Sequence, residues 1–248
     1  MKKKKIILII IMLIFLILIV FSLYKIILWS IDNNKSRELL DDISSDIIIN
    51  EDISDFNVKE KYIVDFESLK EKNNDVTAWI KVNNTNIEYP VVKTNNNDYY
   101  LNHSFDKKPN LAGWPFMNYK NDMSFNDKNI TIFAHARKDG SMFGTLKNIL
   151  TDDYRQKNSD NNIILVSEKE SAIYEIFSTY KIEDELYYFK DNFNNDDEFN
   201  EFIKNIKSRS NYDYNVNLDD VKQILTLSTC DVNDNYRIVV HAKKVNNI

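Results

Sequence analysis

Residues 224–230 read ILTLSTC, a run of apolar and β-branched residues that ends at Cys230, the only cysteine in the chain. The polar stretch DVNDN follows at residues 231–235, so the pattern predicts a buried strand that ends in a loop. A cysteine at the end of a strand lies at the rim of a sheet, where loops can build a site. Because it is alone, it excludes an internal disulfide and a cysteine-rich zinc site. Cys230 is therefore either an inert buried thiol or a nucleophile.

Short segments of the same character recur over about 170 residues of the chain. Clusters of Asn and Asp separate them, as at residues 95–98. Seven or eight such strands predict a mostly β fold, either a barrel or a sandwich, with a short helix that ends near Asn73. The expected strands are Val76–Val82, Thr85–Val92, Asn129–Ala134, Asn162–Ser167, Ser171–Glu183, Val221–Thr229 and Tyr236–Val245.

One amphipathic helix is predicted over Asp196–Arg209, between the last long strands. Its apolar residues recur at helical spacing and form a single stripe. They are Phe199, Phe202, Ile203 and Ile206. Acidic residues occupy the first turn and basic residues the last, which complements the helix dipole. We expect the stripe to pack against the strands.

The N-terminus has the charge and hydropathy pattern of a membrane anchor. Residues 6–24 carry no charge and are apolar or aromatic except for Ser22, and a helix of this length spans roughly 28 Å, close to a bilayer core. Lysines at residues 2–5 place the N-terminus in the cytoplasm and the rest of the chain outside. A cleaved signal peptide is the alternative, but no small-residue cleavage site follows. We expect residues 1–29 to form the anchor and residues 30–61 an acidic stalk or helix.

The charge of the remaining chain argues against nucleic acid as a partner. The formal net charge is −6, and residues 1–25 contribute five lysines and no acids. The rest of the chain therefore has 27 basic against 38 acidic residues, a net charge of −11 that repels phosphate backbones. The chain has three glycines and no glycine-rich motif, so a phosphate loop is not expected either.

A nucleophilic thiol needs a base, and the chain offers three histidines. His135 follows the expected strand at residues 130–134 and therefore also lies at a strand end. His103 is in a polar segment and is expected to be a solvated loop histidine. His241 lies within the last expected strand, facing either the core or the site, and is the alternative base.

Arg237 lies seven residues past Cys230, at the start of the last expected strand. If the last two strands form a hairpin, Arg237 comes next to Cys230 across the turn. Its guanidinium could then stabilise an oxyanion in acyl transfer or hold a substrate carbonyl. The alternative is a surface arginine that pairs with one of the many acidic residues.

Together these residues resemble the signature of the sortases, membrane-anchored cysteine transpeptidases of Gram-positive bacteria. TLSTC at residues 226–230, with an arginine opening the next strand, is similar to their TLxTC…R motif. ITIFAH at residues 130–135 resembles the strand that ends in their catalytic histidine, although Ala134 replaces the usual glycine. The segments that resemble class B in particular are residues 139–146, residues 89–101 and the helix at 196–209, which matches the helix inserted between their sixth and seventh strands.

The resemblance covers roughly residues 62–245 and implies that residues 62–248 form a closed eight-stranded β-barrel with peripheral helices. It implies that Cys230, as a thiolate, attacks the carbonyl of a threonine in a C-terminal sorting signal, nearer to NPQTN than to LPxTG, and forms a thioacyl enzyme. His135 would protonate the leaving amine and deprotonate the incoming one, while Arg237 would support the oxyanion or fix the peptide. The positions that match substrate-groove residues are Asn97, Leu101, Ser228 and Asp231.

The implied partners are the sorting-signal peptide of a surface protein, an amine of peptidoglycan or of its lipid-linked precursor, and the membrane. No cofactor or metal is required. Three alternatives stay open. One is another cysteine acyl-transfer enzyme, such as an L,D-transpeptidase or a papain-like thiol protease, although their local motifs are absent. The others are a catalytically inactive domain that binds sorting signals and a pilin-polymerising sortase with a lysine acceptor.

Overall fold

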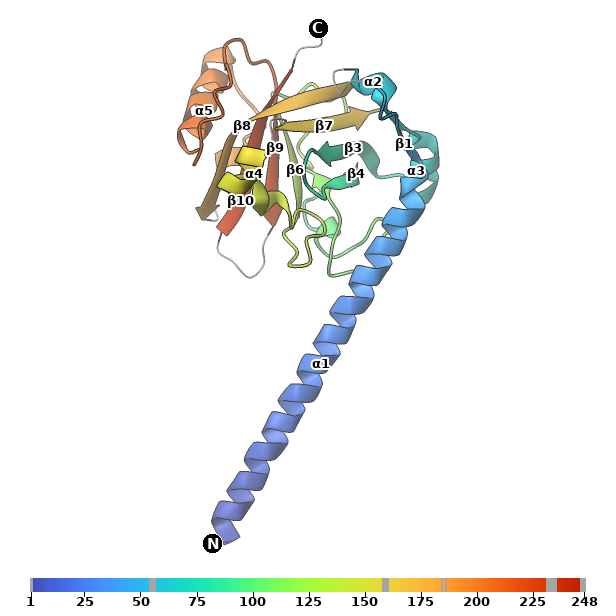
Figure 1. The fold of residues 1–248 in the computed structure, drawn as a ribbon, viewed down its shortest axis with the longest axis vertical. Helices are drawn as coiled ribbons and strands as arrows, with labels where there is room; N and C mark the ends of the chain where they lie inside the picture. Colours follow the sequence, from blue (N-terminus) through green and yellow to red (C-terminus); the bar gives the residue numbers. More distant parts are fainter. Residues whose placement is uncertain are drawn as a thin grey trace.

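A computed structural model of the chain describes residues 2–53, 57–157, 161–183, 185, 187–230 and 236–245. Its strands close into a barrel in the order β10-β8-β7-β3-β4-β5-β6-β9 (Figure 1). The closed barrel, rather than a sandwich, is therefore the fold. The strands are β3 Val76–Val82, β4 Glu88–Val92, β5 Phe116–Met117, β6 Asn129–His135, β7 Asn162–Ser167, β8 Ser171–Glu183, β9 Ile224–Cys230 and β10 Tyr236–Lys244.

Strand pairing decides where the candidate site lies. β6 and β9 pair parallel, in a continuous register from Asn129↔Ile224 to His135↔Cys230. Two parallel neighbours end at the same edge of a sheet, so the last residues of both strands reach one rim of the barrel. β10 pairs antiparallel with β9 and therefore starts at that same rim. The lower end of the barrel in Figure 1, toward which the N-terminal helix extends, is this rim.

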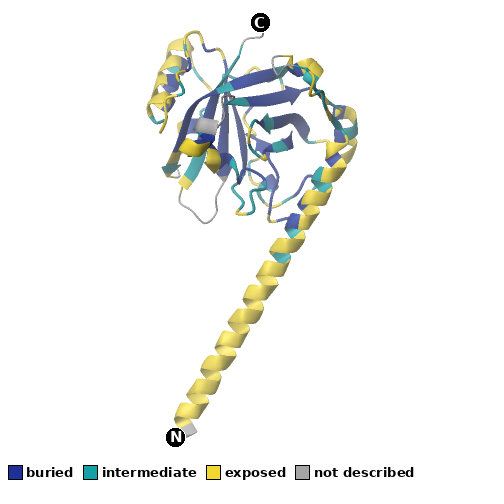
Figure 2. Cartoon of the chain, viewed as in Figure 1, coloured by how far each residue is buried: buried dark blue, intermediate teal, exposed yellow. Residues whose placement is uncertain are grey.

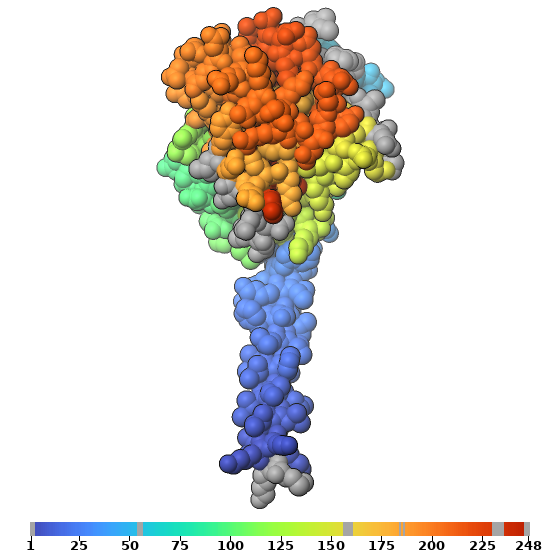
Figure 3. All heavy atoms as spheres, turned by 90° about the vertical axis from the view of Figure 1, so that its left-hand side faces the viewer, coloured from blue at the N-terminus to red at the C-terminus, as the bar shows by residue number. Residues whose placement is uncertain are grey.

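Helix α5, Asp196–Ser208, covers the outer side of the barrel between β8 and β9. Asn195 caps it, since its side chain accepts a hydrogen bond from the Glu198 amide at 2.8 Å. The predicted apolar stripe is buried against Phe177 of β8 and Ile224 of β9. Figure 3 shows α5 and the segment after it forming the upper part of this face.

Helix α1, Lys2–Ser44, is one continuous helix of 43 residues, so it includes the expected anchor and the first part of the expected stalk or helix. Its apolar side chains from Ile6 to Ile27 are exposed, and by length and composition the helix can cross a membrane (Figures 1 and 2). Past the apolar stretch it meets the barrel, because Asn33 and Ser36 are buried and Ile43 joins the core. The division at residues 29 and 61 stays a prediction.

Small elements join α1 to the barrel and fill the connections between strands. A two-stranded sheet pairs residues 47–49 with residues 62–64, and the barrel core extends onto Tyr62. The remaining elements are β1 Ile47–Ile49, α2 Val58–Lys61, β2 Tyr62–Val64, α3 Phe66–Lys72, α4 Asp152–Lys157 and the short helices η1 Tyr99–Leu101, η2 Leu146–Leu150 and η3 Tyr187–Phe189.

Candidate active site

His135 is the last residue of β6 and is partly exposed at the rim. Its Nε2 atom lies 2.7 Å from the carbonyl oxygen of Leu101, on η1. A carbonyl oxygen only accepts hydrogen bonds, so Nε2 carries a proton, and the neutral ring has its lone pair on Nδ1. The Leu101 carbonyl thereby sets both the orientation and the tautomer of the candidate base.

Two neighbouring segments contact His135, one at its backbone and one at its ring. The Phe143 amide donates to the His135 carbonyl at 2.9 Å, which closes the loop that follows the strand. Gly113 lies against the imidazole ring, since a β-carbon there would lie 3.0 Å from His135 Cδ2. Ala134, in the place of the family's usual glycine, lies in the extended backbone of β6, which requires no glycine.

The backbone of Cys230 ends β9 directly beside His135, and its side chain lies outside the described part. Neighbouring strands in a sheet are separated by roughly 4.8 Å, so the register brings the two candidate residues to adjacent positions. Two strands nearly a hundred residues apart in the sequence thus pair side by side, and a histidine and a cysteine occupy paired positions at the rim.

Arg237 lies on β10 with its guanidinium aimed toward the end of β9. Nη1 is 3.4 Å from the carbonyl oxygen of Thr229, the residue before Cys230, and the Thr229 hydroxyl accepts from the Ile238 amide at 2.9 Å. β9 and β10 pair antiparallel up to Val239↔Ser228. Arg237 comes two residues before this last pair and Cys230 two residues after it, so both lie at the rim where the paired strands end. A permanent cation therefore lies at the carbonyl of the residue that precedes the candidate nucleophile.

The predicted substrate-groove residues occupy different environments. Asn97 donates to Asn118 Oδ1 at 3.2 Å and accepts from the Tyr119 amide at 3.0 Å. Leu101 lies against His135. Ser228 is fully buried and shares a 2.9 Å hydrogen bond with the Tyr188 hydroxyl, so its side chain lines no open groove in this structure. Asp231 lies outside the described residues. The binding roles of all four stay predictions.

Two contributors to the site could not be found by sequence reasoning. The Leu101 carbonyl that orients His135 is a backbone group, and every residue type carries one. Tyr188, on η3, contacts Ser228 from the segment before α5, but nothing in the sequence around it marks it. Both depend on tertiary structure that brings distant segments together.

His241 is a core residue, and its assignment as the alternative base is wrong. It is fully buried, about four residues along the sheet from the rim, between Tyr180 and Thr226. The Thr226 hydroxyl donates to Asn129 Oδ1 at 2.7 Å, so it accepts from His241 Nδ1, while Nε2 accepts from the Tyr180 hydroxyl at 2.8 Å. The neutral ring thus has both nitrogens hydrogen-bonded.

His103 stacks on Tyr99 with ring centroids 4.0 Å apart.

Burial, with a smaller contribution from the positive charge of Arg209, lowers the pKa of His241 to about 3. In the unfolded chain this group protonates near pH 6.5, so the unfolded state binds more protons at lower pH. As the pH falls from about 6.5 to about 3, we expect the free energy of unfolding to fall by about 1.4 kcal/mol per pH unit from this residue alone. Denaturant unfolding of the wild type and of His241→Gln at several pH values measures this pH dependence. Equal slopes for both proteins would contradict this assignment.

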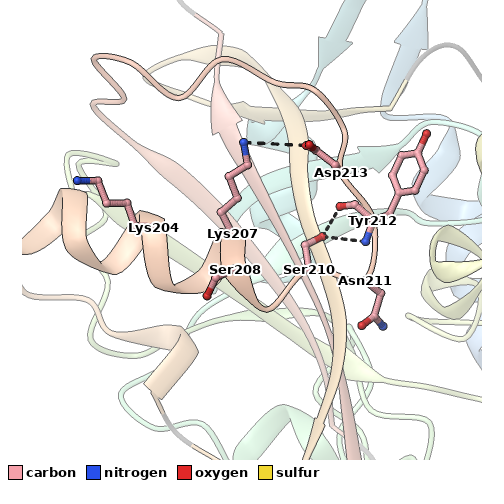
Figure 4. A pocket seen from close by; sticks show the side chains of 7 residues that line it. All are labelled: Lys204, Lys207, Ser208, Ser210, Asn211, Tyr212 and Asp213. Atoms are coloured by element: carbon pink, nitrogen blue, oxygen red, sulfur yellow. Dashed lines mark hydrogen bonds and ion pairs between the residues drawn. The ribbon is translucent and has the colours of Figure 1, made fainter.

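A pocket of about 430 Å³ lies apart from this rim, at the end of α5 (Figure 4). Within it, the Ser210 hydroxyl donates to the Tyr212 carbonyl at 2.7 Å, and Lys207 and Asp213 approach to 4.0 Å. None of its residues belongs to the predicted site. They are Lys204, Lys207, Ser208, Ser210, Asn211, Tyr212 and Asp213. In the described part of the chain, no group of three or more His, Cys, Asp or Glu side chains is arranged to bind a metal.

Comparisons with known proteins identify relatives of the whole chain. The sortase domain model matches residues 80–245. Sortase B of Listeria monocytogenes serovar 1/2a is 31% identical over 248 residues, 99% of each chain. Sortase B of Staphylococcus aureus is 32% identical over 185 residues, 72% of this chain and 73% of the relative.

Solved structures of the same class share the fold. A sortase B structure from B. anthracis superimposes with a TM-score of 0.74 at 30% identity, covering 87% of this chain and 99% of that chain. A Staphylococcus aureus sortase B–substrate complex superimposes with a TM-score of 0.68 at 31% identity, covering 73% and 84%.

Proposed function

Since the chain belongs to the sortase family and to its class B, we propose that Cys230, His135 and Arg237 form the catalytic centre of a cysteine transpeptidase that attaches a surface protein to the cell wall. The observation that supports this best is the parallel register of β6 and β9, which sets His135 beside Cys230. The Arg237 guanidinium at the Thr229 carbonyl adds a cation at the same point. A cysteine, a histidine and an arginine whose backbones meet at one rim support a site with a nucleophile, a base and an anion-binding group.

In the first half of the proposed reaction, the Cys230 thiol passes its proton to Nδ1 of His135, and the resulting thiolate attacks the carbonyl carbon of a threonine in the sorting signal. Arg237 stabilises the negative oxygen of the tetrahedral intermediate. When the peptide bond breaks, His135 donates a proton to the departing amine, and a thioester to Cys230 remains. The Leu101 carbonyl bonds Nε2, so the proton moves through Nδ1.

In the second half, an amine attacks the thioester. His135 removes the proton of the incoming amine, an amide bond forms, and the Cys230 thiolate leaves. We propose an NPQTN-like signal and an amine of peptidoglycan or its lipid-linked precursor as acceptor. The solved complex of Staphylococcus aureus sortase B with its substrate supports a sorting signal as the substrate. We further propose that α1 anchors the enzyme in the cell membrane as a single span, with the N-terminus in the cytoplasm and the barrel outside.

The intact mass of the full chain in detergent micelles, mixed with a panel of sorting-signal peptides, tests this function. We expect an adduct of the peptide fragment on the wild type and none on Cys230→Ala. Hydroxylamine or an oligoglycine amine should release the adduct, because both attack a thioester. The peptide that reacts identifies the signal.

The alternatives predict other results. A folded wild type whose thiol is alkylated but which forms no adduct with any peptide would indicate an inactive, signal-binding barrel. Release by a peptide with a free lysine side chain, but not by oligoglycine, would indicate a pilin-polymerising enzyme.

A further inference from the structure

The hydrogen bonds between α1 and the loop at residues 110–111 lie in one short stretch of the helix, immediately past the apolar span. Asn110 Nδ2 donates to the Asp32 carbonyl at 3.1 Å and to the Ser36 hydroxyl at 3.2 Å. The Leu111 amide donates to the Asp32 carboxylate at 3.1 Å. Asn33, Ser36 and Asn110 are buried, so the bond between Asn110 and Ser36 is shielded from water, whereas the bond between Leu111 and Asp32 lies at the surface.

Arg137, in the segment that follows β6, also contacts α1. Its guanidinium donates to Asn33 Oδ1 and, at 3.3 Å, to the Leu111 carbonyl, and it lies 5.6 Å from the ring centroid of Trp29. Asp139 holds its far side, with Nε and Oδ1 3.9 Å apart. Arg137 follows His135 by two residues, so fixing its side chain fixes the turn that leaves β6.

A second set of hydrogen bonds connects α1 with His135 through the loop that follows Leu101. The Asn110 amide donates to the Asn102 carbonyl at 2.9 Å, and the Gly113 amide to the Asn110 carbonyl at 3.1 Å. The Leu101 carbonyl at the start of this loop accepts from His135 Nε2. α1 thus holds the loop that orients the imidazole and the arginine that follows it.

α1 also makes apolar contacts with the barrel, because Ile43 lies in the core and Leu40 packs against it. The hydrogen bonds of residues 32–36 are additional, and they lead to the two segments that hold His135. From this geometry we propose that Asn33 and Asp32 are positioning residues, and that the membrane-proximal turn of α1 keeps His135 aligned for catalysis. This inference rests on the proposed function of His135.

The test compares two asparagines that are neighbours on α1. Asn33 is buried against Arg137, whereas Asn34 is exposed. In full-length protein in detergent micelles, with the peptide found in the adduct assay, we expect Asn33→Ala to lower kcat about tenfold with KM unchanged. Asn34→Ala should match the wild type. Asn33→Asp keeps an acceptor for Arg137 and should restore kcat to within about twofold of the wild type.

The outcomes are distinguishable. Equal kcat for Asn33→Ala and Asn34→Ala would overturn the positioning role. So would a loss in Asn33→Ala that follows its melting temperature and is not rescued by Asn33→Asp, because that pattern indicates folding alone. A wild type that reacts with no peptide would overturn the proposed function, and this inference with it.

Discussion

His135→Gln is expected to lower the rates of thioester formation and of transfer by about a thousandfold, the loss that removing a general acid–base group typically causes. Glutamine is a close test because its side-chain amide can still donate to the Leu101 carbonyl, as Nε2 does at 2.7 Å. The orientation and the fold are then kept, while the group that exchanges a proton is gone. Adduct formation by intact mass reports the first half-reaction, and release by an oligoglycine amine reports the second.

His103→Gln is the matched control for this prediction. His103 is also partly exposed, but its imidazole stacks on Tyr99 and its Nδ1 atom lies 2.7 Å from the Tyr99 carbonyl. We expect it to keep the wild-type rates within about twofold, since the stacking and the hydrogen bond of its ring are both to Tyr99. A His135→Gln protein that retains a tenth of the wild-type rate would show that another group moves the proton.

The strands were predictable where local pattern decides them. β3, β7 and β8 have the expected bounds, because runs of β-branched and aromatic residues are flanked by turn-forming Asn, Asp and Ser. Two of the site residues were accessible for the same reason, since a histidine and a cysteine that each end such a run must reach an edge of the sheet. The resemblance to the sortases then supplied their roles.

The remainder depended on contacts between distant segments. β5 has two residues, too few to show any alternation. The parallel pairing of β6 with β9 joins strands far apart in the sequence, and local pattern carries no information about such a pair. His241 reads as a possible base in its strand, and only its burial beside Tyr180 and Thr226 shows it to be a core residue. The contact between Asn33 and Arg137 is equally invisible in the sequence.

Gly113→Ala is expected to reduce the transfer rate by about a hundredfold, because it displaces the group that orients His135. Gly113 has φ +64°, a left-handed conformation that costs other residues about 1–2 kcal/mol. A β-carbon there would lie 2.6 Å from the Tyr100 carbonyl oxygen and 2.9 Å from the Leu101 carbonyl oxygen. Both distances are too short, so the Leu101 carbonyl must move away from His135 Nε2.

Gly140→Ala separates this displacement from backbone strain. Gly140 also has a positive φ, +84°, but a β-carbon there would meet Thr145 Cγ2 at an ordinary 3.5 Å. Both variants should therefore lose stability from the left-handed backbone, whereas only Gly113→Ala should lose catalytic rate in proportion to the shift of Leu101. Steady-state kcat and the melting temperature of each variant measure the two effects. If the two alanine variants show the same kcat, the Leu101 carbonyl does not orient the catalytic histidine.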